Sequence, residues 1–192
     1  MGDKNQISYL KRFMPTLDGP VLEIGSKDYG NTASFRDHFV GNEYVGIDMA
    51  EGKGVDHVLD LVEGTGDLPK SHFALAICCS VLEHVRKPWV MADNIASLVR
   101  EGGMAYISVP WVWRYHAYPD DYFRFSWRGV EELFPGFDWQ HIYYSTNIPD
   151  EFYEITPETT RIDKELGVKK WTLHGKRKYL PSLMVNMLGT KR

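Results

Sequence analysis

Apolar and polar residues follow each other along the chain in blocks that predict strands separated by helices. Runs of about four to eight apolar residues are typical of buried strands. Seven such runs lie near residues 21–24, 44–47, 55–61, 73–79, 104–109, 139–145 and 182–188. Helical spacing occurs between them, as where Met91, Ile95 and Leu98 share one face of residues 89–100. Strands that alternate with helices predict an α/β fold with a doubly wound, mostly parallel sheet and helices on both faces.

Capping residues and prolines predict where these elements end. Gly102 and Gly103 are expected to end the helix before them as a C-cap, and Pro110 to stop the strand that follows. Ser126 is expected to be the N-cap of a further helix. Residues 1–19 are expected to form a helical lead-in to the first strand.

Two long irregular stretches interrupt the alternation of predicted strands and helices. The 192 residues of the chain are enough for one domain. Residues 110–126 read PWVWRYHAYPDDYFRFS and are rich in aromatic side chains. Residues 147–181 contain three prolines, at 149, 157 and 181. Loops of this length in a compact domain are usually functional. We therefore expect both stretches to be insertions on the substrate side of a single domain that spans residues 1–192.

Composition argues against several classes of protein. No apolar run is long enough to cross a bilayer, and the first residues lack the apolar core of a signal peptide. The two cysteines, Cys78 and Cys79, are neighbours, and neighbours on a strand point to opposite faces, which makes a bridge between them awkward. Reduced thiols fit a cytoplasmic protein. Neither a CxxC nor an HExxH pattern is present, so no metal site is expected.

Charge is distributed unevenly along the sequence. The chain has 22 Lys or Arg and 26 Asp or Glu, whereas residues 161–192 contain nine of the former and two of the latter. The remainder is therefore acidic, which argues against binding to nucleic acid. The basic segment either meets an anionic substrate or, as we favour, forms a solvated surface. Its residues include Lys169, Lys170, Lys176, Arg177 and Lys178.

Residues suited to a nucleotide-like ligand follow each of the first four predicted strands. In open α/β sheets, ligands bind beyond the carboxyl ends of the strands. The first strand ends at Gly25, where a glycine lets the backbone turn and approach a ligand. Asp48 follows the second strand, where a carboxylate accepts hydrogen bonds from a ribose diol. Asp60 and Leu61 end the third strand, in a place suited to an adenine ring, and Ser80 follows the fourth.

In their order and spacing, these segments resemble the class I S-adenosylmethionine-dependent methyltransferases over about residues 21–192. The segments that carry the resemblance are VLEIGS (21–26), YVGID (44–48), DHVLDL (56–61), FALAICCSVLEHV (73–85) and LVREGGMAYISVP (98–110). The resemblance implies a Rossmann-like sheet of seven strands with an antiparallel last strand. It implies S-adenosylmethionine as the cofactor and S-adenosylhomocysteine as the product. The residues it assigns to the cofactor are Glu23, Gly25, Ser26 and Lys27 at the amino-acid end, Asp48 and Met49 at the ribose, Asp60 and Leu61 at the adenine, and Ser80 beside the methionine moiety.

The glycine loop departs from the pattern Gly-x-Gly-x-Gly that is usual in this family. Lys27 and Tyr29 replace the second and third glycines, and Gly30 comes one place late. A side chain at these positions either crowds the carboxylate of the cofactor or, in the case of Lys27, pairs with it. We interpret the loop as a variant that still binds the cofactor.

Candidate catalytic residues lie near the same strand ends. An oxygen nucleophile gains from deprotonation by a His or a carboxylate. The candidates are His116, Asp120, Asp121 and His84. His116 ranks first, because the loop after the fifth strand faces the donor methyl in this architecture, and the resemblance implies a structural role for His84. Either aspartate is alternatively a turn cap or a partner of Arg124.

The leading hypothesis is a methyltransferase that O-methylates a small molecule or a sugar or glycan, as a monomer or homodimer without nucleic-acid or membrane partners. Residues 116–134, HAYPDDYFRFSWRGVEELF, resemble a small methyltransferase subgroup with some members linked to sugar modification. Aromatic residues of the same loop either line an acceptor pocket or pack the loop onto the sheet. They are Trp111, Trp113, Tyr115, Tyr118 and Tyr122.

Two alternatives stay open at the level of sequence. A nicotinamide-dependent oxidoreductase shares the strand, the glycine turn and the acidic residue, but the GxGxxG pattern is absent. A non-catalytic methyltransferase-like partner protein is supported by Lys27 and Tyr29 in the glycine loop, and is opposed by the acidic residues that remain at the strand ends.

Overall fold

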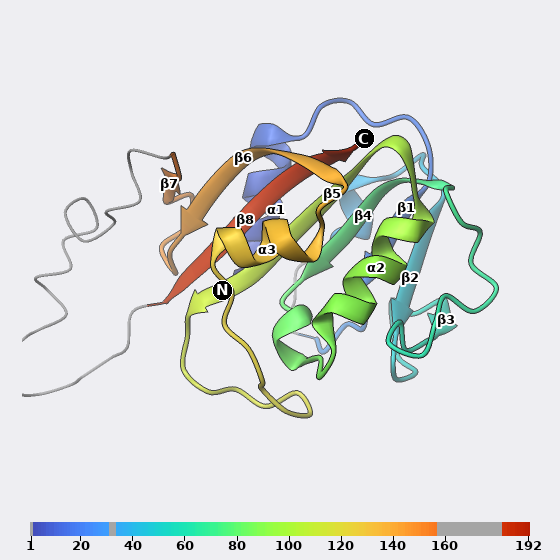
Figure 1. Cartoon of the computed structure of the whole chain (residues 1–192), viewed down its shortest axis with the longest axis horizontal. Coiled ribbons are helices and arrows are strands. Elements are labelled where there is room, and N and C mark those ends of the chain that lie inside the picture. The colour runs from blue at the N-terminus through green and yellow to red at the C-terminus, as the bar shows by residue number, and fades with distance from the viewer. Residues whose placement is uncertain (1, 31–33, 157–181) are drawn as a thin grey trace, which may run out of the picture.

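The computed structural model describes residues 2–30, 34–156 and 182–192. In this part of the chain, eight strands form one sheet in the order β3-β2-β1-β4-β5-β8-β6-β7 (Figure 1). The strands are β1 (Val21–Ile24), β2 (Tyr44–Asp48), β3 (His57–Val58), β4 (Phe73–Cys79), β5 (Val99–Val112), β6 (Phe137–Ser145), β7 (Phe152–Glu154) and β8 (Leu183–Lys191).

Strand directions confirm the predicted fold class. β1 pairs in parallel with β2 and β4, β2 with β3, and β4 with β5. The last strand, β8, lies between β5 and β6 and is antiparallel to both. The sequence pattern does not predict β7, an eighth strand that pairs with β6 at the edge. An all-parallel dinucleotide-binding sheet has the order 3-2-1-4-5-6, so the antiparallel β8 sets this sheet apart from that of a nicotinamide-dependent oxidoreductase.

Helices cover both faces of the sheet. α2 (Pro88–Leu98) and α3 (Trp127–Leu133) lie on one face and α1 (Gly2–Phe13) on the other (Figure 1). Pro88 occupies the first turn of α2, where a missing N–H removes no helical hydrogen bond. Ser126 caps α3 as expected, because its Oγ accepts a hydrogen bond from the N–H of Gly129 at 3.1 Å.

Each face of the sheet has a buried apolar core of its own. Ile95 and Leu98 of α2 pack into the core on one face, and Ile7 and Tyr9 of α1 into the core on the other. The Tyr9 ring stacks on that of Tyr106 in β5, with ring centroids 4.9 Å apart. β4 is buried along nearly its whole length, because helices cover both of its faces.

The third strand is shorter than the sequence predicts. Residues 55–61 are expected to form it, but β3 contains only His57 and Val58, whose side chains are exposed. β3 lies at the edge of the sheet and pairs only with β2. Leu61, at the end of the predicted strand, is buried in the core that includes α2 rather than in the sheet.

Two further predictions, for the Gly102–Gly103 pair and for Pro110, are wrong. α2 ends at Leu98, and Gly102 and Gly103 lie inside β5 rather than capping the helix. A Cβ atom at Gly103 would lie 2.9 Å from the carbonyl oxygen of Phe73, so this glycine permits close approach within the sheet. Pro110 does not stop β5, because it lies at a register irregularity with β8 where a missing donor is tolerated.

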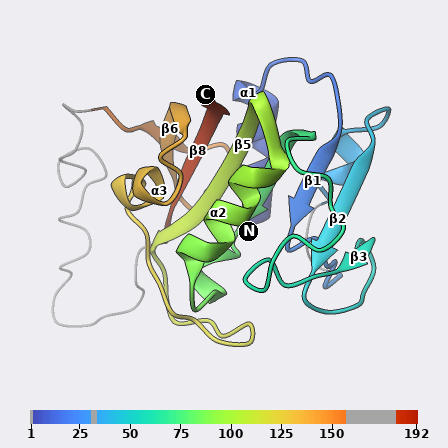
Figure 2. The same cartoon turned by 45° about the vertical axis from the view of Figure 1, so that its right-hand side comes forward.

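The aromatic-rich stretch after β5 lies on the side of the sheet where the parallel strands end. Figure 2 shows this segment, between β5 and α3, extending beyond the ends of the strands and passing below α2. The second predicted insertion, residues 147–181, is described only as far as residue 156 and includes β7. Lys169, Lys170, Lys176, Arg177 and Lys178 lie outside the described residues. Within the described ranges, no helix is long and apolar enough to cross a membrane.

Candidate functional site

A cavity of about 460 Å³ lies beside the carboxyl end of β1. Its walls come from β1 and the loop after it, from Gln6 of α1, and from Ile77 and Cys79 of β4. Four of the predicted cofactor residues line it, namely Glu23, Gly25, Ser26 and Lys27. The volume lies within the range of pockets that hold small molecules and cofactors.

Gly25 brings the loop after β1 against the turn after β4. Its φ of 76° belongs to the left-handed region that favours glycine. The N–H groups of Gly25 and Ser26 donate to the carbonyl oxygen of Ile47 in β2, at 2.9 and 3.0 Å. A Cβ atom at position 25 would lie 2.4 Å from Cγ2 of Val81. The backbone of this loop is therefore fixed to β2 and close to the end of β4.

Ser26 is a buried polar residue of the cavity wall, and Glu23 is a half-buried one. The Ser26 side chain is buried, and its Oγ has no hydrogen-bond partner among the described residues. A buried hydroxyl without a partner is rare in proteins, and this one packs against β2, where a Cβ atom at Gly46 would lie 2.7 Å from it. Glu23 accepts a hydrogen bond from the Tyr44 hydroxyl at 2.6 Å. Burial raises the pKa of Glu23, and the bond from Tyr44 opposes that rise.

Lys27 and Tyr29 lie together in the loop after β1. The Lys27 alkyl chain covers Gly52, and its Nζ lies 5.4 Å from the centre of the Tyr29 ring. The Lys27 N–H donates to Oδ2 of Asp48 at 3.4 Å. The Tyr29 ring meets the Tyr118 ring edge to face at 5.4 Å. The loop after β5 therefore reaches the glycine loop, which brings the two predicted halves of the site together.

Asp48 is the last residue of β2 and Asp60 lies two residues after β3, and neither lines the cavity. Oδ1 of Asp48 accepts a hydrogen bond from the N–H of Ala50 at 3.0 Å, and Oδ1 of Asp60 accepts one from Val62 at 2.8 Å. Both carboxylates thus stabilise turns in the manner of Asx turns. The second oxygen of Asp48, Oδ2, is the one that accepts the hydrogen bond from the Lys27 N–H.

The remaining three predicted cofactor residues also lie outside the cavity wall. Met49 is 58% exposed, whereas Leu61 is buried in the core. Ser80 has a positive φ of 55°, and its Oγ accepts a hydrogen bond from Nε2 of Gln6 at 3.1 Å. Gln6 is therefore a link from α1 to the end of β4 that the sequence alone does not indicate.

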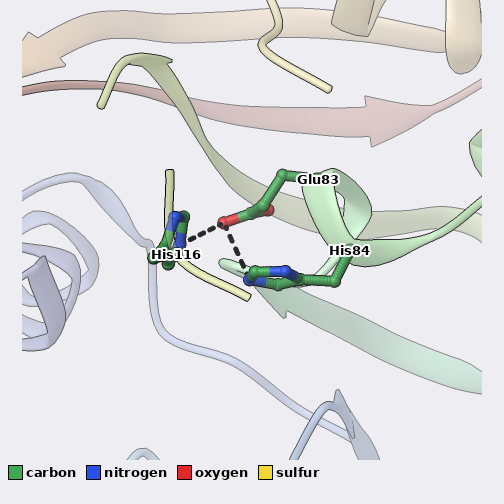
Figure 3. Close-up of side chains that lie close together, drawn as sticks. All are labelled: Glu83, His84 and His116. Carbon is green, nitrogen blue, oxygen red and sulfur yellow. Dashed lines mark ion pairs between the residues drawn. The ribbon is translucent and has the colours of Figure 1, made fainter. Parts of the chain in front are cut away.

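A second polar cluster forms where the loop after β5 meets the turn after β4. Glu83 and His84 belong to the 3-10 turn η2 (Leu82–His84), and His116 belongs to the loop (Figure 3). Oε1 of Glu83 lies 3.8 Å from Nε2 of His84 and 3.9 Å from Nε2 of His116. The Glu83 side chain is 1% exposed, that of His84 12% and that of His116 27%. The cluster thus opens to solvent on the His116 side.

Glu83 is buried without hydrogen-bond partners for its side chain. Neither carboxylate oxygen has a partner among the described residues. Burial raises the pKa of Glu83 to about 8. The backbone carbonyl of Glu83 accepts hydrogen bonds from the N–H groups of Tyr122 and Phe123 at 2.8 and 3.2 Å. The returning arm of the loop thereby holds the turn that carries Glu83.

Outer hydrogen bonds hold both imidazoles. Nδ1 of His84 lies 2.6 Å from the carbonyl oxygen of Asp120. Nδ1 of His116 lies 3.2 Å from Oδ2 of Asp121, which also accepts a hydrogen bond from the His116 backbone N–H at 2.8 Å. Burial lowers the pKa of His84, and the bond to the Asp120 carbonyl opposes that change.

The four predicted catalytic residues therefore converge, with different environments. The Asp121 side chain is 1% exposed and forms a two-pronged ion pair with Arg124, with Nη2 2.7 Å from Oδ2. This contact lowers the pKa of Asp121 strongly and holds it ionised. Asp120 accepts a hydrogen bond from the Tyr115 hydroxyl at 3.1 Å. Asp121 thus positions His116, and Glu83 is the site residue that sequence reasoning missed, although it directly precedes the candidate His84.

The aromatic residues of the loop divide into exposed and packed members. Tyr115 and Tyr118 are 68% and 63% exposed, and Trp111 and Tyr122 are each 38% exposed. The Trp113 ring lies 6.2 Å from the His116 ring. Most of the aromatic side chains of this loop are thus exposed to solvent.

Solved structures share this fold at low sequence identity. An S-adenosylmethionine-dependent methyltransferase from Archaeoglobus fulgidus is 16% identical, with a TM-score of 0.61 over 96% of this chain and 92% of that chain. Phosphoethanolamine N-methyltransferase 2 of Haemonchus contortus is 14% identical, with a TM-score of 0.59 over 97% of this chain and 52% of that chain. The 1,6-didemethyltoxoflavin-N1-methyltransferase of Burkholderia thailandensis is 15% identical, with a TM-score of 0.59 over 97% and 76%.

Comparison of sequences identifies the family. No curated protein matches the sequence significantly. Residues 5–147 match the family described as "Methyltransferase domain". This range contains most of α1, the cavity, the glycine loop and the cluster of Glu83, His84 and His116. The chain therefore belongs to the methyltransferase domain family, and its fold is that of the class I S-adenosylmethionine-dependent methyltransferases.

Proposed function

We propose that this protein transfers a methyl group from S-adenosylmethionine to an oxygen of a small-molecule or glycan acceptor. The observation that carries the proposal is the meeting of the glycine loop after β1 with the aromatic loop after β5, at the contact of Tyr29 and Tyr118. One loop lines the cavity, and the other contributes His116 to the cluster with Glu83 and His84. A cofactor site and an acceptor site thus share a border.

The residues present fit the cofactor. Gly25 and Ser26 carry the backbone of the loop along the cavity wall, and Gly25 takes a left-handed φ of 76° that favours glycine. We assign Glu23, Gly25, Ser26 and Lys27 to the amino-acid end of the cofactor. Along the neighbouring strand ends, we assign Asp48 and Met49 to the ribose, Asp60 and Leu61 to the adenine, and Ser80 to the methionine side.

The cluster of Glu83, His84 and His116 activates the acceptor in this proposal. S-adenosylmethionine, when bound, supplies an electrophilic methyl on sulfur and leaves as the thioether S-adenosylhomocysteine. The acceptor oxygen forms the new C–O bond with a lone pair, and its proton passes to the cluster. His116 is the most exposed of the three and lies on the acceptor side. Asp121 orients His116, and the Asp120 carbonyl orients His84.

The two alternative functions are N-methylation and a non-catalytic role as a partner protein. Two of the structural neighbours are N-methyltransferases, and an amine acceptor needs a neutral lone pair more than it needs a base. A non-catalytic partner protein would bind the cofactor or another enzyme without turnover. The buried, partner-free carboxylate of Glu83 favours chemistry, because an inactive domain gains nothing from such a group. We expect the protein to act in the cytoplasm as a monomer or homodimer, without nucleic acid or membrane.

An assay with methyl-labelled S-adenosylmethionine tests this function. Small molecules and oligosaccharides are offered in matched pairs that carry either a hydroxyl or an amine at the same place. We expect label on the hydroxyl member, with kcat reduced about 100-fold in His116→Ala, within the range for loss of a general base. His72→Ala is the matched control, because His72 also lies 3.9 Å from a glutamate but on the exposed surface. Label on the amine alone would contradict O-methylation.

A further inference from the structure

The side chains of Glu83, His84 and His116 present three electron-pair donors to one point. One ligand atom from each residue lies within 4.8 Å of the other two. Figure 3 shows the Glu83 carboxylate pointing between the two imidazole rings, which come from the turn after β4 and from the loop after β5. The two distances from Oε1 of Glu83, 3.8 and 3.9 Å, exceed the length of a hydrogen bond. No shared proton therefore holds these atoms together.

Hydrogen-bond partners assign the protons of both rings. The Asp120 carbonyl oxygen only accepts, so Nδ1 of His84, 2.6 Å away, carries a proton and donates it. Nδ1 of His116 lies 3.2 Å from both the Asp121 carboxylate and the Arg114 carbonyl, and it donates for the same reason. In the neutral tautomer, Nε2 of each ring then keeps a lone pair. Both lone pairs are on the side of Glu83.

We propose that Glu83, His84 and His116 bind a divalent first-row transition-metal cation such as Zn²⁺ or Mn²⁺. Two imidazoles and one carboxylate form a known ligand set for such ions. Metal bonds of about 2.0–2.2 Å place ligand atoms about 3–4 Å apart around one ion. The two distances to Glu83 already have this value. The cation also gives the buried carboxylate a partner, which it lacks among the described residues.

The groups around the three ligands match the outer shell of a metal site. Metal-bound histidines usually donate their other ring N–H to a carboxylate or a carbonyl, which fixes the ring. The Asp120 carbonyl does so for His84, and the Asp121 carboxylate does so for His116. Arg124 in turn holds Asp121 in a two-pronged ion pair. The ionisable groups that face the site are thus Glu83 and Asp121, with Arg124 behind Asp121, and the site is net negative when Glu83 is ionised.

The cation gives the proposed methyl transfer an acceptor class. Three protein ligands leave coordination positions open, and His116 marks the side that solvent reaches. An acceptor hydroxyl on the cation would have a lowered pKa and would release its proton to solvent on that side, because a bound cation occupies the lone pairs of His84 and His116 that would otherwise accept the proton. We therefore infer an acceptor whose hydroxyl is accompanied by a second oxygen, so that it binds the cation at two points. This role rests on the proposed function, whereas binding of the cation does not.

Metal binding is measured on the full chain after removal of any histidine tag and of bound metal with a chelator. Equilibrium dialysis against Zn²⁺ alone and Mn²⁺ alone is expected to give one equivalent per chain. Glu83→Gln keeps the shape of the side chain, and it and His116→Ala are each expected to weaken binding at least tenfold. His72→Ala, which alters an exposed histidine–glutamate pair, is expected to leave binding unchanged. Circular dichroism confirms that each variant is folded.

The Mn²⁺ arm also has a spectroscopic signature. The sharp electron paramagnetic resonance signal of free Mn²⁺ is expected to disappear as the ion binds and to persist with Glu83→Gln. Less than one tenth of an equivalent of either ion, or binding that all variants retain, overturns the metal site. Binding of S-adenosylhomocysteine is measured in the same samples without metal. If the protein binds S-adenosylhomocysteine but binds neither Zn²⁺ nor Mn²⁺, only the metal site is overturned. If it binds a metal ion but does not bind S-adenosylhomocysteine, only the proposed function is overturned.

Discussion

The backbone at Gly25 lies so close to Val81 that a single methyl group would not fit between them. A Cβ atom at Gly25 would stand 2.4 Å from Cγ2 of Val81, and the φ of 76° would strain any other residue. Val81 lies two residues before Glu83. This contact therefore couples the wall of the cofactor cavity to the turn that carries the polar cluster.

Gly25→Ala tests this coupling. Left-handed strain and overpacking together are expected to lower the free energy of unfolding by about 3 kcal/mol. Val81→Ala in the same chain removes the clash with the new methyl group at position 25 and is expected to restore part of the lost free energy of unfolding. The backbone strain at position 25 is expected to remain. Urea unfolding of the wild type, both single variants and the double variant measures the interaction. Strict additivity of the two changes would show that the two side chains do not meet.

Asp121→Asn tests whether Asp121 positions His116. The amide keeps the shape but loses the charge that orders the His116 ring and pairs with Arg124. We expect metal affinity to fall about tenfold, as for outer-shell partners of metal ligands. Asp120→Asn is the matched control, because Asp120 holds His84 through its backbone carbonyl. Equal losses in the two variants would argue against a specific role for the Asp121 carboxylate.

The link from α1 to the sheet is tested by Gln6→Leu. Nε2 of Gln6 donates to Oγ of Ser80 and of Ser108, each at 3.1 Å, in a buried setting. The variant loses both hydrogen bonds, although the Ser108 hydroxyl still donates to Oδ1 of Asn186 at 3.0 Å, and we expect the free energy of unfolding to fall by about 1–3 kcal/mol. Lys4→Leu, at an exposed position of the same helix, is expected to have little effect. A stable Gln6→Leu protein would contradict the role of this hydrogen-bonded link.

Stability at acid pH depends on Asp56 near the cavity. Burial alone would raise the pKa of Asp56, but the hydrogen bonds from the Gly46 N–H and from Arg36 outweigh it and lower the pKa below its usual value. A lowered pKa in the folded state contributes stability above the ordinary pKa of aspartate, and this contribution is lost as pH falls through the lowered pKa.

Asp56→Asn is therefore expected to destabilise the protein at pH 7 and to show a smaller difference from the wild type as pH falls below about 4. Thermal unfolding at a series of pH values measures the difference. Asp67→Asn changes an exposed carboxylate and serves as the control. A difference that grows toward acid pH would have the opposite sign to the one that the lowered pKa of Asp56 requires.

The sheet is predictable from sequence because each strand of the core is a short apolar run with a polar residue at its end. β4 is apolar throughout and is buried on both faces, so its pattern is unambiguous. β3 is not predictable in length, because an edge strand with exposed side chains has little apolar pattern. Gly102 and Gly103 resemble a helix cap in sequence, and only the position of Phe73 shows why glycine is needed inside β5.

The candidate site is predictable in part. Residues that follow a strand directly, such as Gly25 and Asp48, have places fixed by the direction of parallel strands. The cluster of Glu83, His84 and His116 depends on the path of a loop that returns over the turn after β4, and local sequence does not encode that path. No spacing motif for a metal joins Glu83 to His116, because the loop brings them together across more than thirty residues.

Binding of S-adenosylhomocysteine, measured by isothermal titration calorimetry, tests the central claim most directly. The full chain is predicted to bind one equivalent of S-adenosylhomocysteine, and Asp48→Ala is predicted to weaken binding at least tenfold by removing the acceptor at the end of β2. Asp67→Ala, an exposed position away from the strand ends, is predicted to bind like the wild type. No heat of binding with the folded wild type, or equal binding by Asp48→Ala, would contradict the account.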